Sequence, residues 1–331
     1  MQYRRLGGSD LNVSVIAFGA WQLGDPAYWG VDDRADAAAT VHAALDGGVN
    51  FFDTAELYGQ GQSEEALGEI LGAKRKDVCI ASKVSPDHCA PSELRAACEN
   101  SLRRLGTDFL DLYQVHWPFR HVPFDDACAE LLRLRDEGKI RWIGVSNFGP
   151  TDLRAWLSAG PCVSNQLGYS ILFRAIEYET LPLCRDCDIG VMAYMPLMQG
   201  LLSGRWASAD DVPQNRRRTR HFAGSRPGVR HGGPGCEKRT FDAIAQLKAV
   251  AQEWEMSLSA MAIAWTLARP GIATAALGAR KPEQLLENLR GADLSLTSSM
   301  LERIDAISDP LKQELGPNPD LWLSGSDARI R

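Results

Sequence analysis

Short runs of β-branched, aromatic and other apolar residues recur along the whole chain, and each is followed by a segment with helical periodicity. Several of these runs are almost continuously apolar, which is typical of strands buried on both faces of a parallel sheet. The predicted strands are 15–20, 50–54, 78–84, 109–116, 141–147, 162–168, 190–196 and 273–277. Strand and helix are therefore expected to alternate from one end of the chain to the other.

The segments between these strands carry apolar or small residues at the three- and four-residue spacing of amphipathic helices. One such stripe consists of Leu94, Ala97, Cys98, Ser101, Leu102 and Leu105. Similar stripes begin at Phe124 and at Phe241. Glycines stand between several helical segments and the next strand, where a left-handed C-cap would end the helix. These glycines are Gly47, Gly48, Gly106, Gly138 and Gly190.

Eight strands alternating with helices predict an α/β fold, a (β/α)8 barrel, as a single domain over residues 1–331. A doubly wound sheet is the alternative, but it would place Gly-x-Gly-x-x-Gly after the first strand. The residues that follow that strand, Trp21-Gln-Leu-Gly-Asp-Pro, do not match. Two stretches have no apolar period: 206–235, a predicted long loop after strand 7, and 310–331, a predicted irregular C-terminal tail.

Composition narrows the class of protein further. The 331 residues carry a net charge of -6, which argues against nucleic acid or an anionic membrane as partner. No apolar run approaches the roughly 20 residues of a membrane-spanning helix, and no signal peptide is expected. Eight scattered cysteines indicate reduced thiols and a cytoplasmic location. Cys184 and Cys187 lack a second Cys/His pair at ligand spacing, so we predict ordinary cysteines there and no metal site.

Polar residues stand at the carboxyl ends of three neighbouring predicted strands. These are Asp53, Lys83 and His116, and Tyr58 follows Asp53 by five residues. Taken singly, each has a structural explanation, as a helix cap, a lysine reaching toward solvent or a packed ring. In barrel enzymes, however, the chemistry lies at this end of the strands. The four side chains are therefore predicted to converge as a catalytic group.

At this point the chain resembles the aldo-keto reductase family, and the resemblance covers about residues 3–305. The segments that carry it are 51–59 (FFDTAELYG), 81–84 (ASKV), 108–116 (DFLDLYQVH), 143–148 (IGVSNF) and 278–284 (GARKPEQ). The residues of these motifs are most similar in type to the bacterial branch near the inositol-operon and general-stress reductases. A more distant resemblance connects the chain to the potassium-channel β-subunits.

The resemblance implies an NAD(P)H-dependent oxidoreductase that interconverts an aldehyde, ketone or sugar lactol with an alcohol or lactone by direct hydride transfer. Tyr58 would be the general acid and base. A free phenol has a pKa of about 10, and the adjacent Lys83 is expected to lower it. Asp53 would pair with Lys83, and His116 would donate a hydrogen bond to the substrate oxygen. The alternative is a cofactor-sensing regulatory or binding module of the same fold with little turnover.

The same resemblance implies a cofactor site. Ser146, Asn147 and Gln166 match residues that bind the nicotinamide carboxamide, and Tyr194 matches the ring stacked beneath it. The pyrophosphate loop is matched by Leu197, Gly200, Leu201, Ser203 and Arg205. The adenosine end is matched by Gly278, Arg280, Gln284, Glu287 and Asn288. Trp21, Asp53 and Pro196 complete the predicted cofactor contacts.

NADP(H) is the predicted cofactor, with NAD(H) as the alternative. Arg280 would meet a 2'-phosphate through two parallel hydrogen bonds. Two positions depart from the family pattern. Met195 replaces a frequent serine, and Leu277 replaces a frequent proline before Gly-Ala-Arg, which weakens the preference for NADP(H).

The predicted partner is a small carbonyl or sugar substrate, bound by Trp21, Tyr58, His116 and Trp117. Two more aromatic residues, Tyr28 and Trp29, are expected to wall the same pocket. The long loop is rich in arginines: Arg216, Arg217, Arg218, Arg220, Arg226 and Arg230. We expect this loop to be solvated or to fold over the cofactor phosphates, with an anionic substrate as the less favoured explanation. The sequence is also compatible with a homo-oligomer.

Overall fold

The computed structural model describes residues 1–24 and 34–331. Its centre is a closed barrel of eight parallel strands, in which the last strand pairs with the first. The strands are β3 (Ile16–Gly19), β4 (Phe51–Asp53), β5 (Cys79–Val84), β6 (Leu110–Val115), β7 (Ile140–Ser146), β8 (Ser164–Gly168), β9 (Gly190–Tyr194) and β10 (Ile272–Leu277). The predicted (β/α)8 barrel and each of its strands are confirmed. Tyr28 and Trp29 lie outside the described residues.

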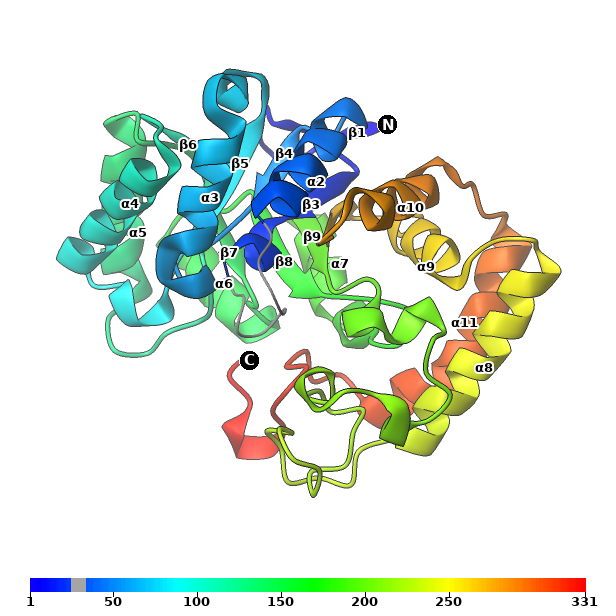
Figure 1. Cartoon of the computed structure of the whole chain (residues 1–331). Coiled ribbons are helices and arrows are strands. Elements are labelled where there is room, and N and C mark those ends of the chain that lie inside the picture. The colour runs from blue at the N-terminus through cyan, green and yellow to red at the C-terminus, as the bar shows by residue number, and fades with distance from the viewer. Residues whose placement is uncertain (25–33) are drawn as a thin grey trace.

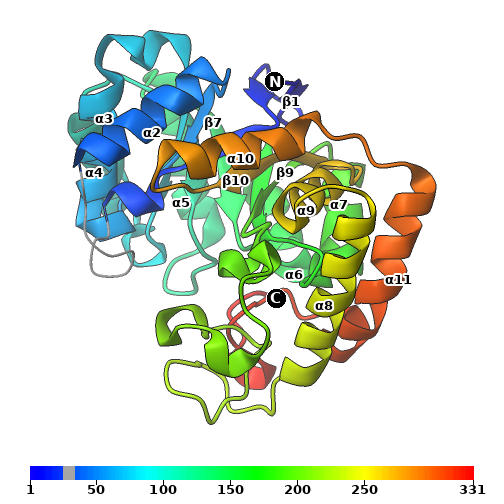
Figure 2. The ribbon, with the colours of Figure 1, turned by 45° about the vertical axis from the view of Figure 1, so that its right-hand side comes forward.

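Helices surround the barrel, as Figures 1 and 2 show from two directions. They are α2 (Arg34–Asp46), α3 (Gln62–Leu71), α4 (Pro91–Leu105), α5 (Phe124–Asp136), α6 (Pro150–Ala159), α7 (Thr180–Asp186), α8 (Glu237–Glu253), α9 (Leu258–Leu267), α10 (Pro282–Asp293) and α11 (Ser298–Leu315). The long helices α8 and α11 lie side by side. Within the described residues, no helix is both long and apolar enough to cross a membrane.

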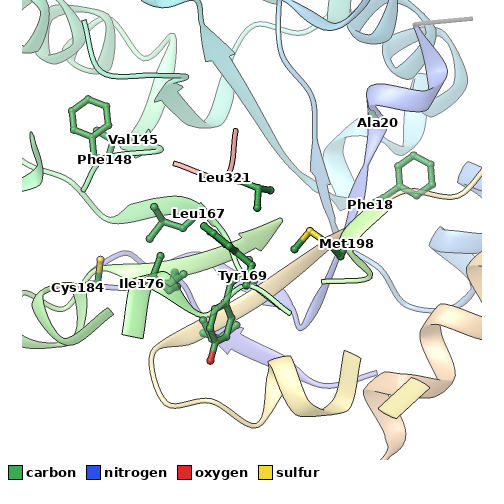
Figure 3. Close-up of a cluster of buried hydrophobic side chains, with 14 of the residues drawn as sticks. Phe18, Ala20, Val145, Phe148, Leu167, Tyr169, Ile176, Cys184, Met198 and Leu321 are labelled. Atoms are coloured by element: carbon green, nitrogen blue, oxygen red, sulfur yellow. The ribbon is translucent and has the colours of Figure 1, made fainter. Parts of the chain in front are cut away.

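The largest hydrophobic cluster lies between the barrel and the helices. Figure 3 shows Leu167 of β8 near Ile176 and Tyr169, together with Leu321 from the C-terminal tail. Both faces of the strands are covered, and every residue of β6 and β8 is buried. This accounts for the nearly continuous apolar runs in the sequence.

An antiparallel hairpin of β1 (Tyr3–Arg5) and β2 (Asn12–Ser14) precedes the barrel and was not predicted. Its buried Leu6 and Val13 belong to one cluster with Phe51 and Leu112, inside the barrel. The hairpin therefore closes the barrel at the amino ends of the strands. It escaped prediction because three-residue strands give almost no periodic signal.

The long loop after β9 is confirmed: the helical elements within residues 206–235 are two short 3-10 helices, Ala209–Asp211 and Gln214–Arg216. Arg220 of this loop donates hydrogen bonds to the carbonyls of Leu315, Asn318 and Asp320. The loop is thus fastened to the C-terminal tail. All eight cysteines are free, and Cys184 lies within α7.

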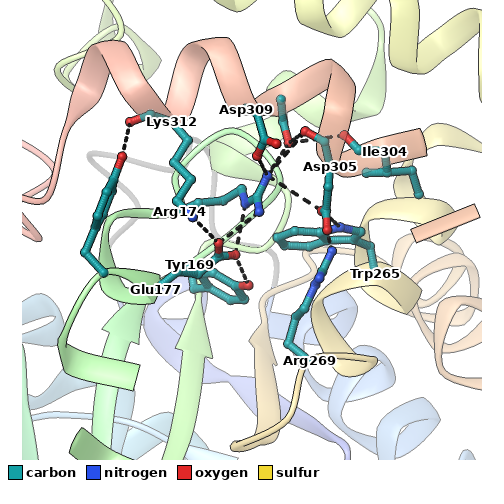
Figure 4. Close-up of polar contacts among 11 residues, drawn as sticks. Tyr169, Arg174, Glu177, Trp265, Arg269, Ile304, Asp305, Asp309 and Lys312 are labelled. Atoms are coloured by element: carbon teal, nitrogen blue, oxygen red, sulfur yellow. Dashed lines mark hydrogen bonds and ion pairs between the residues drawn. The ribbon is translucent and has the colours of Figure 1, made fainter. Parts of the chain in front are cut away.

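The prediction of an irregular tail from Pro310 onward is wrong for its first residues, because α11 continues through Pro310 to Leu315. Ionic contacts hold this helix on both sides of the proline (Figure 4). Arg174 bonds Asp309 at 2.7 Å, and Lys312 bonds Glu177 at 2.7 Å. Tertiary contacts outweigh the backbone hydrogen bond that proline removes. The irregular tail proper comprises residues 316–331.

Candidate active site

The four predicted catalytic residues meet at the carboxyl end of the barrel. Asp53 is the last residue of β4, Lys83 is the penultimate residue of β5, and His116 follows β6 directly. Tyr58 opens a short helical turn, Tyr58–Gly61, in the loop after β4. Register in the sheet places these ends side by side, since Asp53 pairs with Ala81 and Lys83 pairs with Gln114.

Lys83 is completely buried, and its ammonium makes a contact with each of its three donors. Nζ lies 2.9 Å from Asp53 Oδ2, 2.7 Å from the Thr54 carbonyl and 3.3 Å from Tyr58 Oη. Burial by itself would lower the pKa of Lys83, but the negative charge of Asp53 and the phenol raise it above its ordinary value. The lysine is therefore a fixed cation beside the phenol.

The pKa of Tyr58 is raised, which is opposite to the predicted direction. Burial disfavours the phenolate and is the largest effect, and Asp53 adds to it. Lys83 acts in the expected sense, by lowering the pKa, but does not outweigh the burial. Tyr58 consequently holds its proton at neutral pH, which is the state of a proton donor.

His116 faces Tyr58, with ring centroids 5.6 Å apart at an interplanar angle of 81°. Its pKa lies well below the ordinary value because the ring is buried and lies near the Lys83 cation. The imidazole is therefore neutral and has one N–H to donate. Its Nδ1 has no hydrogen-bond partner within the described part of the chain. Trp21 stacks on Tyr58 with ring centroids 5.9 Å apart.

Next to this group, the ends of β7, β8 and β9 bring Ser146, Asn147, Gln166 and Tyr194 together. Asn147 has a left-handed backbone (φ 63°), a conformation that asparagine tolerates better than most residues. Its amide donates to the His116 carbonyl at 3.0 Å and accepts from Tyr194 Oη at 2.7 Å. Asn147 thereby connects the end of β6, at His116, to the end of β9, at Tyr194.

The nicotinamide predicted from the family resemblance can be tested against these residues. The buried Nε2 of Gln166 has no partner among the described residues, so it has a donor available for a carboxamide oxygen. The Asn147 amide is already engaged by protein groups. Gly168 lies close beneath the Tyr194 ring, where a Cβ would come within 3.3 Å of it. The residues present fit a planar ring and its amide.

A single cavity of about 900 Å³ joins both groups. Its walls contain the predicted catalytic, cofactor and substrate residues with two exceptions. Lys83 is buried behind Tyr58, and Leu201 is only 2% exposed and packs in the core. The predicted residues that line the cavity are Trp21, Asp53, Tyr58, His116, Trp117, Ser146, Asn147, Gln166, Tyr194, Pro196, Leu197, Gly200, Ser203, Arg205, Gly278, Arg280, Gln284, Glu287 and Asn288.

The far end of the cavity is built from the segment around Ser203 and the turn at Gly278. The Arg280 amide donates to Gln284 Oε1 at 3.1 Å, and Glu287 accepts from Ser257 Oγ at 2.7 Å. Of the loop arginines, Arg216, Arg218 and Arg230 line the cavity. Two others have structural roles: Arg220 fastens the tail, and Arg226 pairs with Asp210 and Glu237.

Several lining residues were missed by sequence reasoning, and the most informative come from the tail. Trp322 stacks on Tyr194 with centroids 6.2 Å apart, and Arg329 lies over Trp117 at 3.7 Å. Gln22, Trp206 and Ser259 also line the cavity. The tail has no periodic pattern, so only its aromatic and basic composition could have pointed to a role.

With this geometry in view, comparison with known proteins identifies the family. Residues 15–309 match the model of the aldo/keto reductase family. The aldo-keto reductase YhdN of Bacillus subtilis (strain 168) is 33% identical, covering 96% of this chain and 98% of that protein. The NADH-specific methylglyoxal reductase of Escherichia coli (strain K12) is 31% identical, covering 89% and 94%. A probable voltage-gated potassium channel subunit beta of Oryza sativa subsp. japonica is 29% identical, covering 95% and 99%.

Solved structures agree with this assignment. The glycerol dehydrogenase AKR11B4 from Gluconobacter oxydans superposes with a TM-score of 0.81 at 30% identity, covering 96% of this chain and 97% of that one. An aldo-keto reductase from Klebsiella pneumoniae in complex with NADPH gives a TM-score of 0.74 at 28% identity, covering 100% and 99%. The chain belongs to the aldo/keto reductase family of oxidoreductases.

Proposed function

We propose that this protein is an NADP(H)-dependent reductase of aldehydes, ketones or sugar lactols in which Tyr58 is the general acid, and the general base in reverse. One observation carries the proposal. The protonated Tyr58 hydroxyl, the buried Lys83–Asp53 pair and the neutral His116 all meet at one cavity, whose volume is about 900 Å³.

The residues divide the work as follows. A bound reduced nicotinamide would supply hydride to the carbonyl carbon of the substrate. His116 donates a hydrogen bond that orients the carbonyl oxygen, and Tyr58 gives that oxygen a proton. Lys83 stabilises the phenolate that remains, and Asp53 keeps the ammonium placed and charged. Because burial raises the pKa of Tyr58, the phenol is in its protonated form when a carbonyl arrives.

The choice between NADP(H) and NAD(H) is proposed from the residues at the predicted adenosine site. Arg280 lines the cavity beside Gln284, and the adenosine is proposed to bind there because these residues match the family's adenosine segment. A guanidinium binds a 2'-phosphate through charge-assisted hydrogen bonds, which favours NADP(H). The relatives differ among themselves, since one solved structure holds NADPH and the methylglyoxal reductase is named NADH-specific.

The substrate is proposed to be a polar carbonyl compound, or the lactol of an aldose or related polyol. Trp21 and Trp117 supply flat faces, while Tyr58 and His116 aim donors toward one oxygen. A site that binds several hydroxyls should penalise analogues without them, because its own buried groups are left unpaired.

A spectrophotometric screen tests the function directly. The purified protein is assayed with NADPH, NADH, NADP and NAD against aldehydes, aldoses and cyclitols, while the absorbance of reduced nicotinamide is followed. Turnover with a carbonyl compound is expected. Specificity constants for aldoses are then compared with those for simple aldehydes of similar size. If simple aldehydes are preferred by about tenfold throughout, a general aldehyde reductase replaces the sugar assignment.

A second function has one observation in its favour, the similarity to the potassium channel subunit. On that assignment the barrel would sense the redox state of its cofactor for a protein partner. Tight cofactor binding with negligible turnover on every substrate in the screen would support it. The complete catalytic group favours the reductase, because a sensor has no need of a placed proton donor.

A further inference from the structure

The C-terminal tail, residues 316–331, forms part of the cavity wall on the substrate side. Trp322 and Arg329 line the cavity alongside His116 and Trp117. The tail is anchored at its end, because the Arg331 amide donates to Asp152 Oδ2 at 2.8 Å and the Arg331 carbonyl accepts from the Asp152 amide at 2.9 Å. The wall is therefore a fixed part of the fold.

Arg329 is held from behind by the fully buried Asp320. Both Nε and Nη2 of Arg329 lie 3.0 Å from this carboxylate. The carboxylate also accepts backbone N–H bonds from Trp322, Leu323 and Arg329 at 3.0, 3.2 and 3.0 Å. The Asp320 carboxylate is thus stabilised by five N–H donors, of which the Arg329 guanidinium supplies two. Asp320 fixes which edge of Arg329 faces outward.

The outward edge of Arg329 lies among the substrate residues. The guanidinium carbon is 3.7 Å from the Trp117 ring centroid and 5.5 Å from that of Trp322. Trp117 directly follows His116 in the chain, and Trp322 stacks on Tyr194. Nη1 of Arg329 has no hydrogen-bond partner in the described ranges, and 33% of the side chain is exposed. A guanidinium with one free edge on aromatic faces is preorganised to bind a planar anion.

The other arginines that line the cavity come from other segments. Arg205 and Arg280 belong to the segments matched to the cofactor pyrophosphate and adenosine, and Arg216, Arg218 and Arg230 belong to the long loop. Arg329 instead lies over Trp117, the residue that follows His116. We propose that Arg329 binds a carboxylate on the substrate, remote from the reacting carbonyl, and so selects carboxylate-bearing carbonyl compounds. This inference rests on the proposed reductase function and narrows its substrate class.

Two matched aldehydes test the proposal: 4-carboxybenzaldehyde and its neutral near-isostere 4-formylbenzamide. The measured quantity is the ratio of their kcat/KM values at saturating NADPH. We expect the wild-type protein to prefer the carboxylate by about tenfold or more, the scale of a charge-assisted hydrogen bond. In Arg329→Met the ratio should fall to about one, and Arg329→Lys should keep part of it because the charge remains. The amide is intrinsically the more reactive aldehyde, so the expected preference runs against reactivity.

Arg303→Met is the matched control, because Arg303 also pairs with a carboxylate, Glu253, and lies 5.5 Å over a tryptophan, Trp254, but on the outer surface. Its ratio should equal that of the wild type. A wild-type ratio near one, or a full preference retained in Arg329→Met, overturns the proposal. The wild-type ratio alone decides the matter if Arg329→Met fails to fold.

A binding measurement tests the carboxylate site independently of the proposed reductase function. The corresponding alcohols, 4-(hydroxymethyl)benzoate and 4-(hydroxymethyl)benzamide, are titrated calorimetrically into the full chain with NADP present. Tighter binding of the benzoate, lost in Arg329→Met, supports the carboxylate site even if neither aldehyde is reduced, in which case the reductase function is wrong. Equal binding of the two alcohols, or binding of neither, overturns the carboxylate site whatever the turnover.

Discussion

The Lys83 ammonium lies 3.3 Å from the Tyr58 hydroxyl, and its Nζ is also 4.8 Å from the centre of the Tyr58 ring. The lysine is wholly buried, so its charge acts on the phenol with little screening by water. It opposes a burial effect that holds the pKa of Tyr58 above its ordinary value. This balance keeps the proton on Tyr58, while the Lys83 charge would stabilise the phenolate in the proposed proton transfer.

Removing the proton donor should abolish catalysis before it affects binding. Tyr58→Phe keeps the ring that stacks on Trp21 and the cofactor residues, but it loses the hydroxyl. We expect turnover to fall by at least about a hundredfold, with little change in NADPH affinity. Steady-state kinetics and fluorescence titration of NADPH measure the two quantities. Near-normal turnover would mean that Tyr58 is not the general acid.

Replacing the buried cation should be at least as damaging as replacing the phenol. Lys83→Met leaves Asp53 buried without its cation, which costs about 3–5 kcal/mol of folding stability when one partner of a buried pair is removed. Turnover and thermal unfolding are therefore measured together. A folded variant with wild-type turnover would contradict the role of Lys83 in stabilising the phenolate.

The pH profile of reduction follows from the two shifted pKa values. Reduction needs protonated Tyr58, whose pKa is raised, so kcat/KM should fall only as pH rises past about 10. His116 has a pKa well below 6.5, so its protonation should leave no acid limb between about pH 6 and 8. A profile that already falls between pH 7 and 9 would mean that the Lys83 charge outweighs burial. Profiles at saturating NADPH decide between the two.

Arg280 should determine the preference between cofactors. Arg280→Ala is expected to weaken NADPH binding by roughly 1.5–3 kcal/mol, the scale of a hydrogen bond to a charged group. NADH binding should change little, because NADH lacks the 2'-phosphate. Dissociation constants for both cofactors are measured on the same preparations. Equal losses for NADPH and NADH would show that Arg280 does not contact that phosphate.

Glu177 should contribute stability that depends on pH. Burial would raise its pKa, but hydrogen bonds and charge from Arg174, with help from Lys312 and Tyr169, lower it to about 2 (Figure 4). An unfolded glutamate titrates at about 4.3. The contribution of Glu177 is therefore complete above that value and is lost as pH falls toward 2.

Glu177→Gln measures this contribution, with an expected loss of about 1–3 kcal/mol at pH 7. The difference from wild type should shrink between about pH 5 and 2. Glu99→Gln is the control, because Glu99 is a half-exposed carboxylate paired with Lys139 and should cost below about 1 kcal/mol. Chemical denaturation at several pH values gives the free energies of unfolding. A difference that stays constant down to pH 2 would rule out the linkage.

The sequence by itself determined the barrel and the convergence of the predicted catalytic residues. Strands buried on both faces leave continuous apolar runs, and Asp53, Lys83 and His116 stand at their ends, where parallel strands necessarily share one rim. These are local signals whose meaning does not depend on the rest of the chain. The family motifs then located about half of the residues that line the cavity, whereas Leu201 packs inward and Lys83 lies behind Tyr58.

Only the tertiary structure decided how segments without local periodicity are used. The helix through Pro310 persists because Arg174, far away in the chain, binds Asp309 beside the proline. Arg329 reaches the cavity wall beside Trp117 because the buried Asp320 and the ring of Trp117 hold it there. The pKa of Tyr58 likewise depends on how deeply the ring is buried, which no neighbour in the sequence reveals. Contacts between distant residues set all three outcomes, and a pattern confined to neighbouring residues cannot encode them.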